Sequence, residues 1–163
     1  MLLGIISDTH GHVKRTQAAI AELEQRNVSE ILHCGDINTP EVVRLFAHIP
    51  TLFVYGNVDR RREALQEAVD AVFRHGSIAE FHTIVRDGKE IGICHGHTRQ
   101  LSTFLTSNAY DYVLSGHTHV RKDERQGRLR AINPGAIAGL KRQSRSCAVL
   151  DTERDELEFI EVS

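Results

Sequence analysis

The chain opens with a short apolar run, Leu2-Leu3-Gly4-Ile5-Ile6-Ser7, that leads directly into Asp8-Thr9-His10. Runs of this length are typical of buried β-strands, and ligands of α/β sheets bind beyond the carboxyl ends of the strands. Four more such runs end at residues that can bind a metal ion: 30–35 at Asp36, 51–56 at Asn57, 90–94 at His95, and 110–116 at His117-Thr118-His119. Five such endings predict one metal site, gathered at one rim of a sheet.

The first half of the chain alternates strands with helices. The pattern predicts strands at Leu3–Ile6, Ile31–Cys34 and Leu52–Tyr55, and helices at Val13–Gln25, from Thr39-Pro40 onward, and at Arg62–Phe73. Thr39 suits the N-cap of its helix and Pro40 the first helical position. This βαβαβα order implies parallel strands with right-handed crossovers.

The second half is dominated by predicted hairpins. Strands at Ile78–Arg86 and Glu90–Cys94 flank Asp87-Gly88, strands at Val120–Arg125 and Leu129–Ile132 flank Gln126-Gly127, and strands at Cys147–Asp151 and Glu156–Val162 flank a polar turn. Asp-Gly is a strong hairpin signal. A helix at Thr98–Ser107 and a strand at Tyr112–Leu114 are expected between the first two hairpins. We therefore expect an α/β protein with two packed mixed sheets and helices on both outer faces.

The composition is that of an ordinary globular protein. With 163 residues, 40% of them hydrophobic and 26% charged, we expect one domain spanning residues 1–163. The formal net charge of −2 predicts no extended nucleic-acid footprint. No apolar stretch approaches ~18 residues and no secretory signal is expected, so we predict no membrane association. Cys34, Cys94 and Cys147 are expected to be buried in a reducing compartment, which favours a cytoplasmic location.

The candidate ligands comprise two carboxylates, four imidazoles and one amide: Asp8, His10, Asp36, Asn57, His95, His117 and His119. This set is too large for one tetrahedral zinc ion, and two divalent ions that share a bridging carboxylate would use it naturally. Mixed oxygen and nitrogen ligands without thiolate favour Mn²⁺, with Zn²⁺, Fe²⁺, Ni²⁺ or Co²⁺ as alternatives. Two such ions ~3.5–4 Å apart are the usual apparatus of phosphoryl-ester hydrolysis. With a bridging hydroxide the centre would carry a charge of about +1, which attracts an anionic phosphate ester.

The motifs together resemble the ordered set of the calcineurin-like metallophosphoesterases. They are Asp8-x-His10, Gly35-Asp36, Gly56-Asn57-x-Asp59, His95 and Gly116-His117-Thr118-His119, with Asn133-Pro134-Gly135 as a later loop. The short chain is similar to the small prokaryotic phosphodiesterase branch of that family. The resemblance implies a four-layer αββα sandwich and a phosphodiesterase in which a hydroxide bridging two metal ions attacks phosphorus.

The resemblance also implies the metal assignments. Asp8, His10 and His119 would hold one ion, Asn57, His95 and His117 would hold the other, and Asp36 would bridge both. Asp59 is expected to orient a ligand from behind, and Asn133 to shape the edge of the site. His97, two residues after His95, is a candidate catalytic contact for phosphate, alongside Asp36 and Asn57.

One position departs from the family pattern. Many members carry a histidine between the asparagine and the acidic residue of the third motif, where this chain has Val58. That histidine is credited with contacting phosphate or protonating the leaving group, and such catalysis contributes ~10²–10⁴-fold. We therefore expect a modest catalyst that favours good leaving groups, such as aryl phosphodiesters.

Other functions remain open at this point. The same small fold serves an inactive relative as a scaffold in an endosomal coat, so a non-catalytic interaction module is one alternative. A phosphomonoesterase or a nuclease acting on short oligonucleotides is another. The predicted partner is a small phosphodiester substrate, and the edges of the late hairpin strands could pair two copies into a homodimer.

Overall fold

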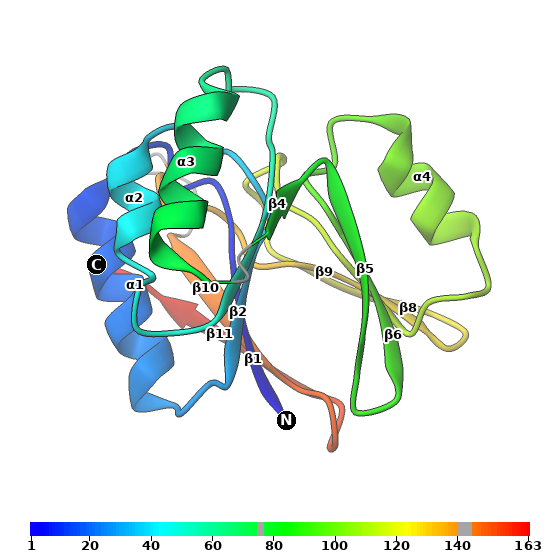
Figure 1. The fold of residues 1–163 in the computed structure, drawn as a ribbon. Helices are drawn as coiled ribbons and strands as arrows, with labels where there is room; N and C mark the ends of the chain where they lie inside the picture. The colour runs from blue at the N-terminus through cyan, green and yellow to red at the C-terminus, as the bar shows by residue number, and fades with distance from the viewer. Residues whose placement is uncertain (75–76, 140–144) are drawn as a thin grey trace.

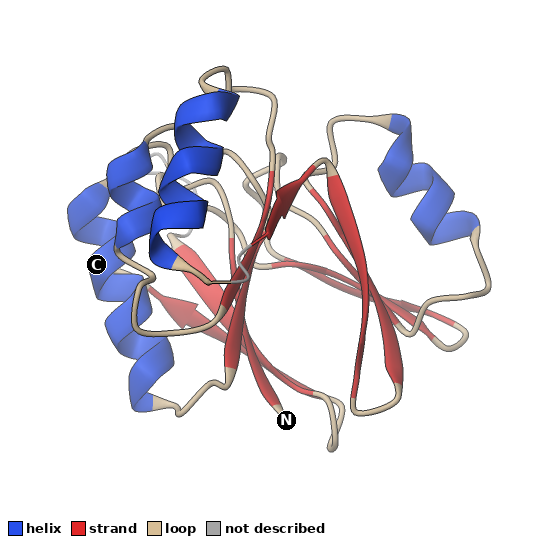
Figure 2. Ribbon diagram, viewed as in Figure 1, coloured by secondary structure: helices blue, strands red, loops and turns tan. Residues whose placement is uncertain are grey.

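The computed structural model describes residues 1–74, 77–139 and 145–163, and these form two packed sheets with helices on both outer faces (Figures 1 and 2). Helices α1, α2 and α3 cover the outer face of the first sheet, and α4 covers the outer face of the second. This is the α/β class with the αββα layer order that the sequence predicted.

The first sheet is mostly parallel. Its six strands have the order β11 (Glu156–Glu161), β10 (Ser146–Asp151), β1 (Leu2–Ile6), β2 (Glu30–His33), β3 (Thr51–Val54) and β4 (Ser77–Ala79). The strands β1 to β4 are parallel, β10 pairs antiparallel with β1, and β11 at the edge pairs antiparallel with β10. The crossovers contain α1 (Val13–Gln25), α2 (Pro40–Arg44) and α3 (Arg62–Val72).

The second sheet contains the later strands. Its order is β5 (Phe81–Arg86), β6 (Lys89–Cys94), β7 (Tyr112–Leu114), β9 (Leu129–Asn133) and β8 (Lys122–Gln126), and α4 spans Arg99–Thr106. The strands β6, β7 and β9 are parallel, while β5 and β8 form hairpins at the two edges.

Strand β1 is buried on both faces, which explains its nearly continuous apolar sequence. Leu3 and Ile5 pack in the apolar layer between the two sheets, whereas Ile6 packs against the helices. A third, smaller apolar cluster packs Phe104 of α4 against Val113 and Leu129 of the second sheet. In the described part of the chain, no helix has both the length and the apolar composition needed to span a bilayer.

Two predicted elements were wrong in detail. The single strand expected at Ile78–Arg86 is broken at Glu80, because Ile78 pairs with Phe53 in the first sheet while Phe81 pairs with Cys94 in the second. One continuous strand cannot serve both sheets.

The second hairpin turn is also shifted by one residue. Gln126 pairs with Leu129, so the turn is Gly127-Arg128 rather than Gln126-Gly127. Gly127 has φ +61°, and a positive φ at the first central position is what a tight hairpin turn of type II′ requires. The first turn was predicted correctly, because Asp87 and Gly88 both have positive φ and lie between the paired Arg86 and Lys89.

Candidate metal centre

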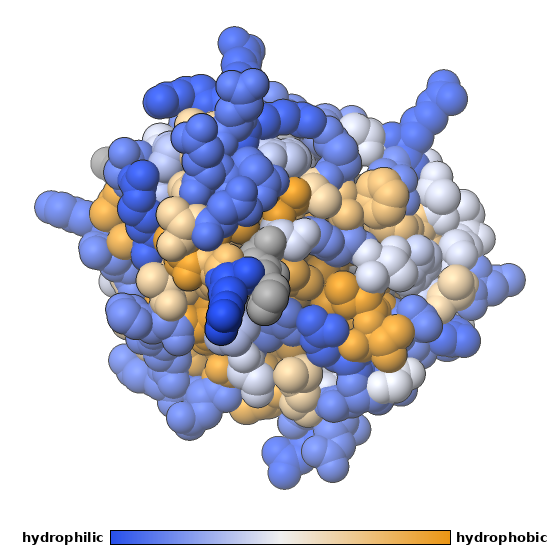
Figure 3. All heavy atoms as spheres, viewed as in Figure 1, coloured by the Kyte–Doolittle hydropathy of each residue, from blue (hydrophilic) through white to orange (hydrophobic). Residues whose placement is uncertain are grey.

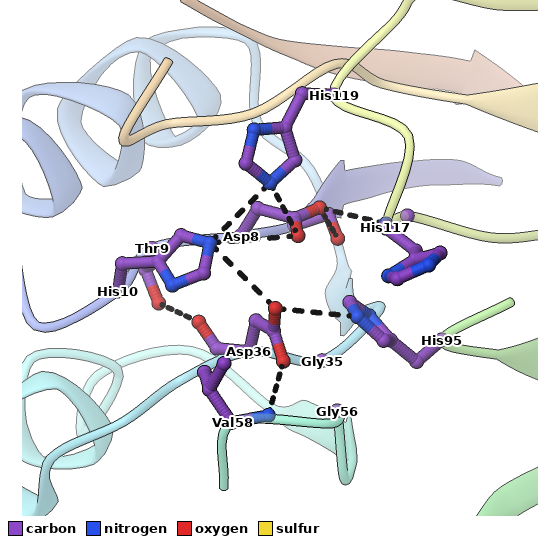
Figure 4. A network of polar contacts seen from close by, with 12 residues as sticks. Asp8, Thr9, His10, Gly35, Asp36, Gly56, Val58, His95, His117 and His119 are labelled. Atoms are coloured by element: carbon purple, nitrogen blue, oxygen red, sulfur yellow. Dashed lines mark hydrogen bonds and ion pairs between the residues drawn. The ribbon is translucent and has the colours of Figure 1, made fainter. Parts of the chain in front are cut away.

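The loops that follow β1, β2, β3, β6 and β7 meet at one rim and bring together the seven side chains singled out in the sequence. Figure 4 shows Asp8, His10, Asp36, His95 and His119 pointing toward a common centre. Three of the loops come from the first sheet and two from the second. The packing of the two sheets therefore places residues more than 100 positions apart at one point.

The first group of donors surrounds Asp8. His119 Nε2 lies 3.1 Å from Asp8 Oδ1 and 3.3 Å from His10 Nε2. His10 Nε2 lies 3.8 Å from the same Asp8 oxygen and 3.6 Å from Asp36 Oδ2. Three side chains that could each offer one ligand atom to a metal ion, Asp8, His10 and His119, thus lie close together.

The second group surrounds His95. His95 Nε2 lies 3.3 Å from Asp36 Oδ2 and 3.0 Å from Asn57 Oδ1. The ring of His117 stands edge-on to that of His95, with 5.1 Å between centroids. Asp36 Oδ2 is therefore adjacent to a histidine of each group.

The donor chemistry fits divalent cations. Asp8 Oδ1 is buried and accepts no hydrogen bond from any residue that the structure describes. His95 Nδ1 is 2.8 Å from the carbonyl oxygen of Cys34, to which it must donate, so in the neutral ring the Nε2 lone pair faces Asp36 and Asn57 oxygens. Lone pairs facing one another repel unless a positive charge lies between them.

The electrostatics of the site also favour positive charge. Burial opposes protonation of His95, but the hydrogen bond to Asp36 and the charges of Asp8 and Asp36 outweigh it and raise the pKa of His95. Burial likewise opposes ionisation of Asp36, and His95 reverses this, so the pKa of Asp36 is lowered. A site that stabilises an imidazolium would also stabilise a metal ion.

Five of the seven side chains sit on strained backbone. The φ angles of Asp8, His10, Asp36, His117 and His119 are 54°, 45°, 56°, 67° and 60°. Each such residue costs about 1–3 kcal/mol and persists only where its surroundings fix it. All five lie in the loops that follow β1, β2 and β7.

Hydrogen bonds between the loops fix this backbone. The N–H groups of Asp8 and His10 donate to the carbonyls of Gly35 and Asp36, each at 2.9 Å. Asp8 Oδ2 accepts from the Ser7 hydroxyl at 2.6 Å and from the His117 N–H at 3.1 Å. Because Oδ2 is occupied, Asp8 presents Oδ1 to the centre.

Two glycines allow the loops to approach so closely. A Cβ at Gly56 would lie 2.0 Å from Asp36 Oδ1, and a Cβ at Gly116 would lie 1.9 Å from Ser7 Oγ. Both distances are far below contact distance. Only glycine at these two positions lets the loops of Asn57 and His117 approach their neighbours so closely.

Asp59 and Asn133 brace the loops from behind. Asp59 accepts from the N–H of Gly56 at 2.7 Å and of Asn38 at 2.6 Å, so it acts on the loop backbones rather than on a ligand side chain. Asn133 donates to the carbonyl of Gly116 at 2.7 Å and so supports the loop of His117 and His119.

His97 lies at the open side of the centre. It is exposed, and its ring centroid is 5.3 Å from that of His95 and 6.1 Å from that of His117. Val58 is half-buried, and its N–H donates to Asp36 Oδ1 at 3.1 Å. Its side chain carries no group that could donate a proton.

Three residues around the site were missed by the sequence interpretation. Ser7 was assigned only to the end of an apolar run, Thr9 was named only between two ligands, and His33 was assigned only to the strand at Ile31–Cys34. All three are fully buried polar residues next to the ligand loops. A polar side chain at the end of an otherwise apolar strand was the available signal.

Comparison with known proteins agrees with this geometry. The model of the calcineurin-like phosphoesterase superfamily domain matches residues 1–155. A phosphodiesterase of Methanocaldococcus jannaschii is 33% identical, with 96% of each chain covered. The solved structure of an archaeal phosphodiesterase superposes with a TM-score of 0.92 at 33% identity, covering all of both chains. Escherichia coli YfcE, a phosphoesterase, shares the fold, with a TM-score of 0.71, 19% identity and all of both chains covered. This chain therefore belongs to the calcineurin-like phosphoesterase superfamily and is an enzyme that hydrolyses phosphoric ester bonds.

Proposed function

We propose that the enzyme is a phosphodiesterase that works with two divalent cations. Asp8, His10 and His119 would hold one cation, and Asn57, His95 and His117 the other. The observation that carries the proposal is the position of Asp36, whose Oδ2 lies 3.6 Å from His10 Nε2 and 3.3 Å from His95 Nε2. A carboxylate between two donor groups is the arrangement that a shared ligand requires.

The cations, once bound, would supply Lewis acidity, a nucleophile derived from water and charge neutralisation of the phosphate. The chain's own residues hold and orient the reacting groups. Val58 N–H fixes Asp36 Oδ1, so that Oδ2 faces the centre. Asn57 places its Oδ1 beside His95, and its amide nitrogen has no partner in the described part of the chain, so it is available to a phosphoryl oxygen.

The substrate we propose is a small phosphodiester with a good leaving group. His97 approaches the centre from solvent and is the side chain best placed to contact phosphate. The side chain of Val58 cannot protonate the leaving group. A diester with a poor leaving group should therefore be hydrolysed slowly. The phosphodiesterase relative supports a diester over a monoester.

We propose Mn²⁺ as the working metal, with Zn²⁺, Fe²⁺, Ni²⁺ or Co²⁺ as alternatives, because imidazole and carboxylate donors without thiolate suit these ions. We also propose a cytoplasmic location. Cys34, Cys94 and Cys147 are all free and buried, which supports a reducing compartment.

The test is an assay of chelator-treated protein, with each metal restored separately. We expect hydrolysis of bis(p-nitrophenyl) phosphate, with weaker hydrolysis of p-nitrophenyl phosphate. Asp36→Asn should lose at least ~10²-fold, as expected when a charge at the reacting centre is removed. Asp70→Asn, an exposed change on α3, is the matched control and should be neutral.

The same assay separates the alternatives. Monoester turnover above diester turnover would make the enzyme a phosphomonoesterase. With short oligonucleotides added as a third substrate, turnover confined to them would make it a nuclease. No turnover with any restored metal would contradict the proposal and favour the non-catalytic scaffold.

A further inference from the structure

His33 is a fully buried histidine that the proposed chemistry does not use. It ends β2, three residues before Asp36, and its ring packs against those of Phe46 and Phe53, with centroids 5.9 and 5.6 Å away. Its two ring nitrogens nevertheless have polar partners. Nε2 lies 3.0 Å from the hydroxyl of Thr9, and Nδ1 accepts from the N–H of Gly35 at 3.2 Å.

These contacts fix the tautomer and the direction of every hydrogen bond. The Gly35 N–H can only donate, so His33 Nδ1 is the acceptor and Nε2 carries the proton. The Thr9 hydroxyl accepts the hydrogen bond from Nε2–H and donates its own to the carbonyl oxygen of Asp36, 3.4 Å away. Burial keeps the ring neutral by lowering the pKa of His33 to about 3.

The chain of bonds joins the two loops that meet at the centre. Thr9 lies between Asp8 and His10, both of which have left-handed backbone, and Gly35 and Asp36 form the facing loop. The bonds therefore run from Thr9, in the loop of His10, to the backbone of Gly35 and Asp36, across the 3.6 Å gap between His10 Nε2 and Asp36 Oδ2. A shift in either loop would change the distances among the donors of both groups.

We propose that His33 and Thr9 are positioning residues that set the cation affinity of the centre by holding the Asp8–His10 loop against the Gly35–Asp36 loop. This inference rests on the proposed function, because it assigns these residues to the same metal centre. Any buried histidine needs hydrogen-bond partners, and here both partners of His33 belong to the loops that carry the metal ligands.

The first measurement is ¹⁵N NMR of the histidines in the metal-free protein, with His33→Phe used to assign the signal. We expect a neutral His33 ring protonated on Nε2 throughout the neutral pH range. A ring protonated on Nδ1, or an imidazolium, would overturn the inference whether or not any metal binds.

The second measurement is Mn²⁺ titration by calorimetry on Thr9→Val, Thr9→Ser and Thr51→Val. Thr9→Val removes the hydroxyl at nearly constant volume, and Thr9→Ser restores it. Thr51 is the matched control, because it is also buried and hydrogen-bonded through its hydroxyl, but to Ile49 at the other end of the sheet. Melting of each metal-free variant reports its folding.

Thr9→Val should weaken Mn²⁺ binding about 10–100-fold, the usual effect of losing a partner behind the ligands. Thr9→Ser should recover most of that loss, and Thr51→Val should bind like the wild type even if it melts lower. Wild-type affinity in Thr9→Val, or an equal loss in Thr51→Val, would overturn the inference alone. A wild-type protein that binds no divalent cation would instead contradict the proposed function, and this inference with it.

Discussion

Val58 stands where the family resemblance of the sequence led us to expect a histidine. Its N–H holds Asp36 Oδ1, but its side chain offers neither an acid nor a phosphate contact. A backbone role of this kind can be filled by any residue except proline, which has no N–H. A substitution can therefore add an acid here without removing the existing hydrogen bond.

Val58→His should consequently raise the rate on an alkyl phosphodiester by ~10-fold or more, a modest share of what general acids contribute. An aryl diester, whose leaving group needs no proton, should gain little. Steady-state kinetics on both esters would check this, with metal content measured in parallel. An alkyl rate that stays unchanged while the metals remain bound would show that this interpretation of position 58 is wrong.

His95 should make cation binding depend on pH. Its pKa is raised above the ordinary value of 6.5, and an imidazolium cannot bind a metal. Protons should therefore compete at a higher pH than for an exposed histidine, and Mn²⁺ affinity should fall as the pH is lowered from 8 to 6. Calorimetry at pH 8, 7 and 6 in buffers of different ionisation enthalpy would count the released protons. Equal affinity at all three values, with no proton release, would contradict the assignment of His95 as a ligand.

At the scale of elements, an ion-pair cluster ties the second sheet to the β10–β11 turn at the end opposite the metal centre. Arg130 on β9 is buried and donates to Asp123 at 2.7 Å and to the side chain of Asp155 at 2.8 Å. Tyr112 and Arg125 also contact Asp155. Burial of Asp155 opposes its ionisation, but these partners outweigh it and lower its pKa to about 2.

Asp155→Asn should lower the free energy of unfolding by about 1 kcal/mol at pH 7, a value reduced for solvent screening because the Asp155 side chain is 38% exposed. A depressed carboxyl pKa stabilises the fold above the unfolded value of ~3.9. The difference between variant and wild type should therefore shrink as the pH falls from about 4 toward 2. Urea unfolding of metal-free protein would measure it, with Asp70→Asn as a neutral control. A difference that did not vary with pH would show that the ion pairs are not its cause.

The sequence was most informative where local chemistry decides the structure. The apolar runs predicted the buried strands. Asp87-Gly88 predicted its hairpin, because the two residues that need a positive φ are adjacent in the chain. It was least informative where partners are distant. The break at Glu80 depends on which sheet each half of the strand joins. The contact of His33 with Thr9 was not predicted, because Thr9 lies 24 positions earlier.

At the scale of the whole molecule, two sheets supply one centre. The first contributes the loops of Asp8, Asp36 and Asn57, and the second those of His95 and His117.

Figure 3 shows apolar side chains gathered on the face where β5 lies, and Phe81 and Val85 on this edge strand are 45% and 52% exposed. The homodimer suggested from strand edges stays a prediction.

The central claim is that seven side chains enclose two cations that share Asp36. Crystals soaked in Mn²⁺ and measured at the manganese absorption edge would test it directly, through anomalous difference density. We predict two peaks per chain, on either side of Asp36, ~3.5–4 Å apart as in other two-metal sites. A single peak, or two peaks that leave Asp36 uncoordinated, would contradict the account.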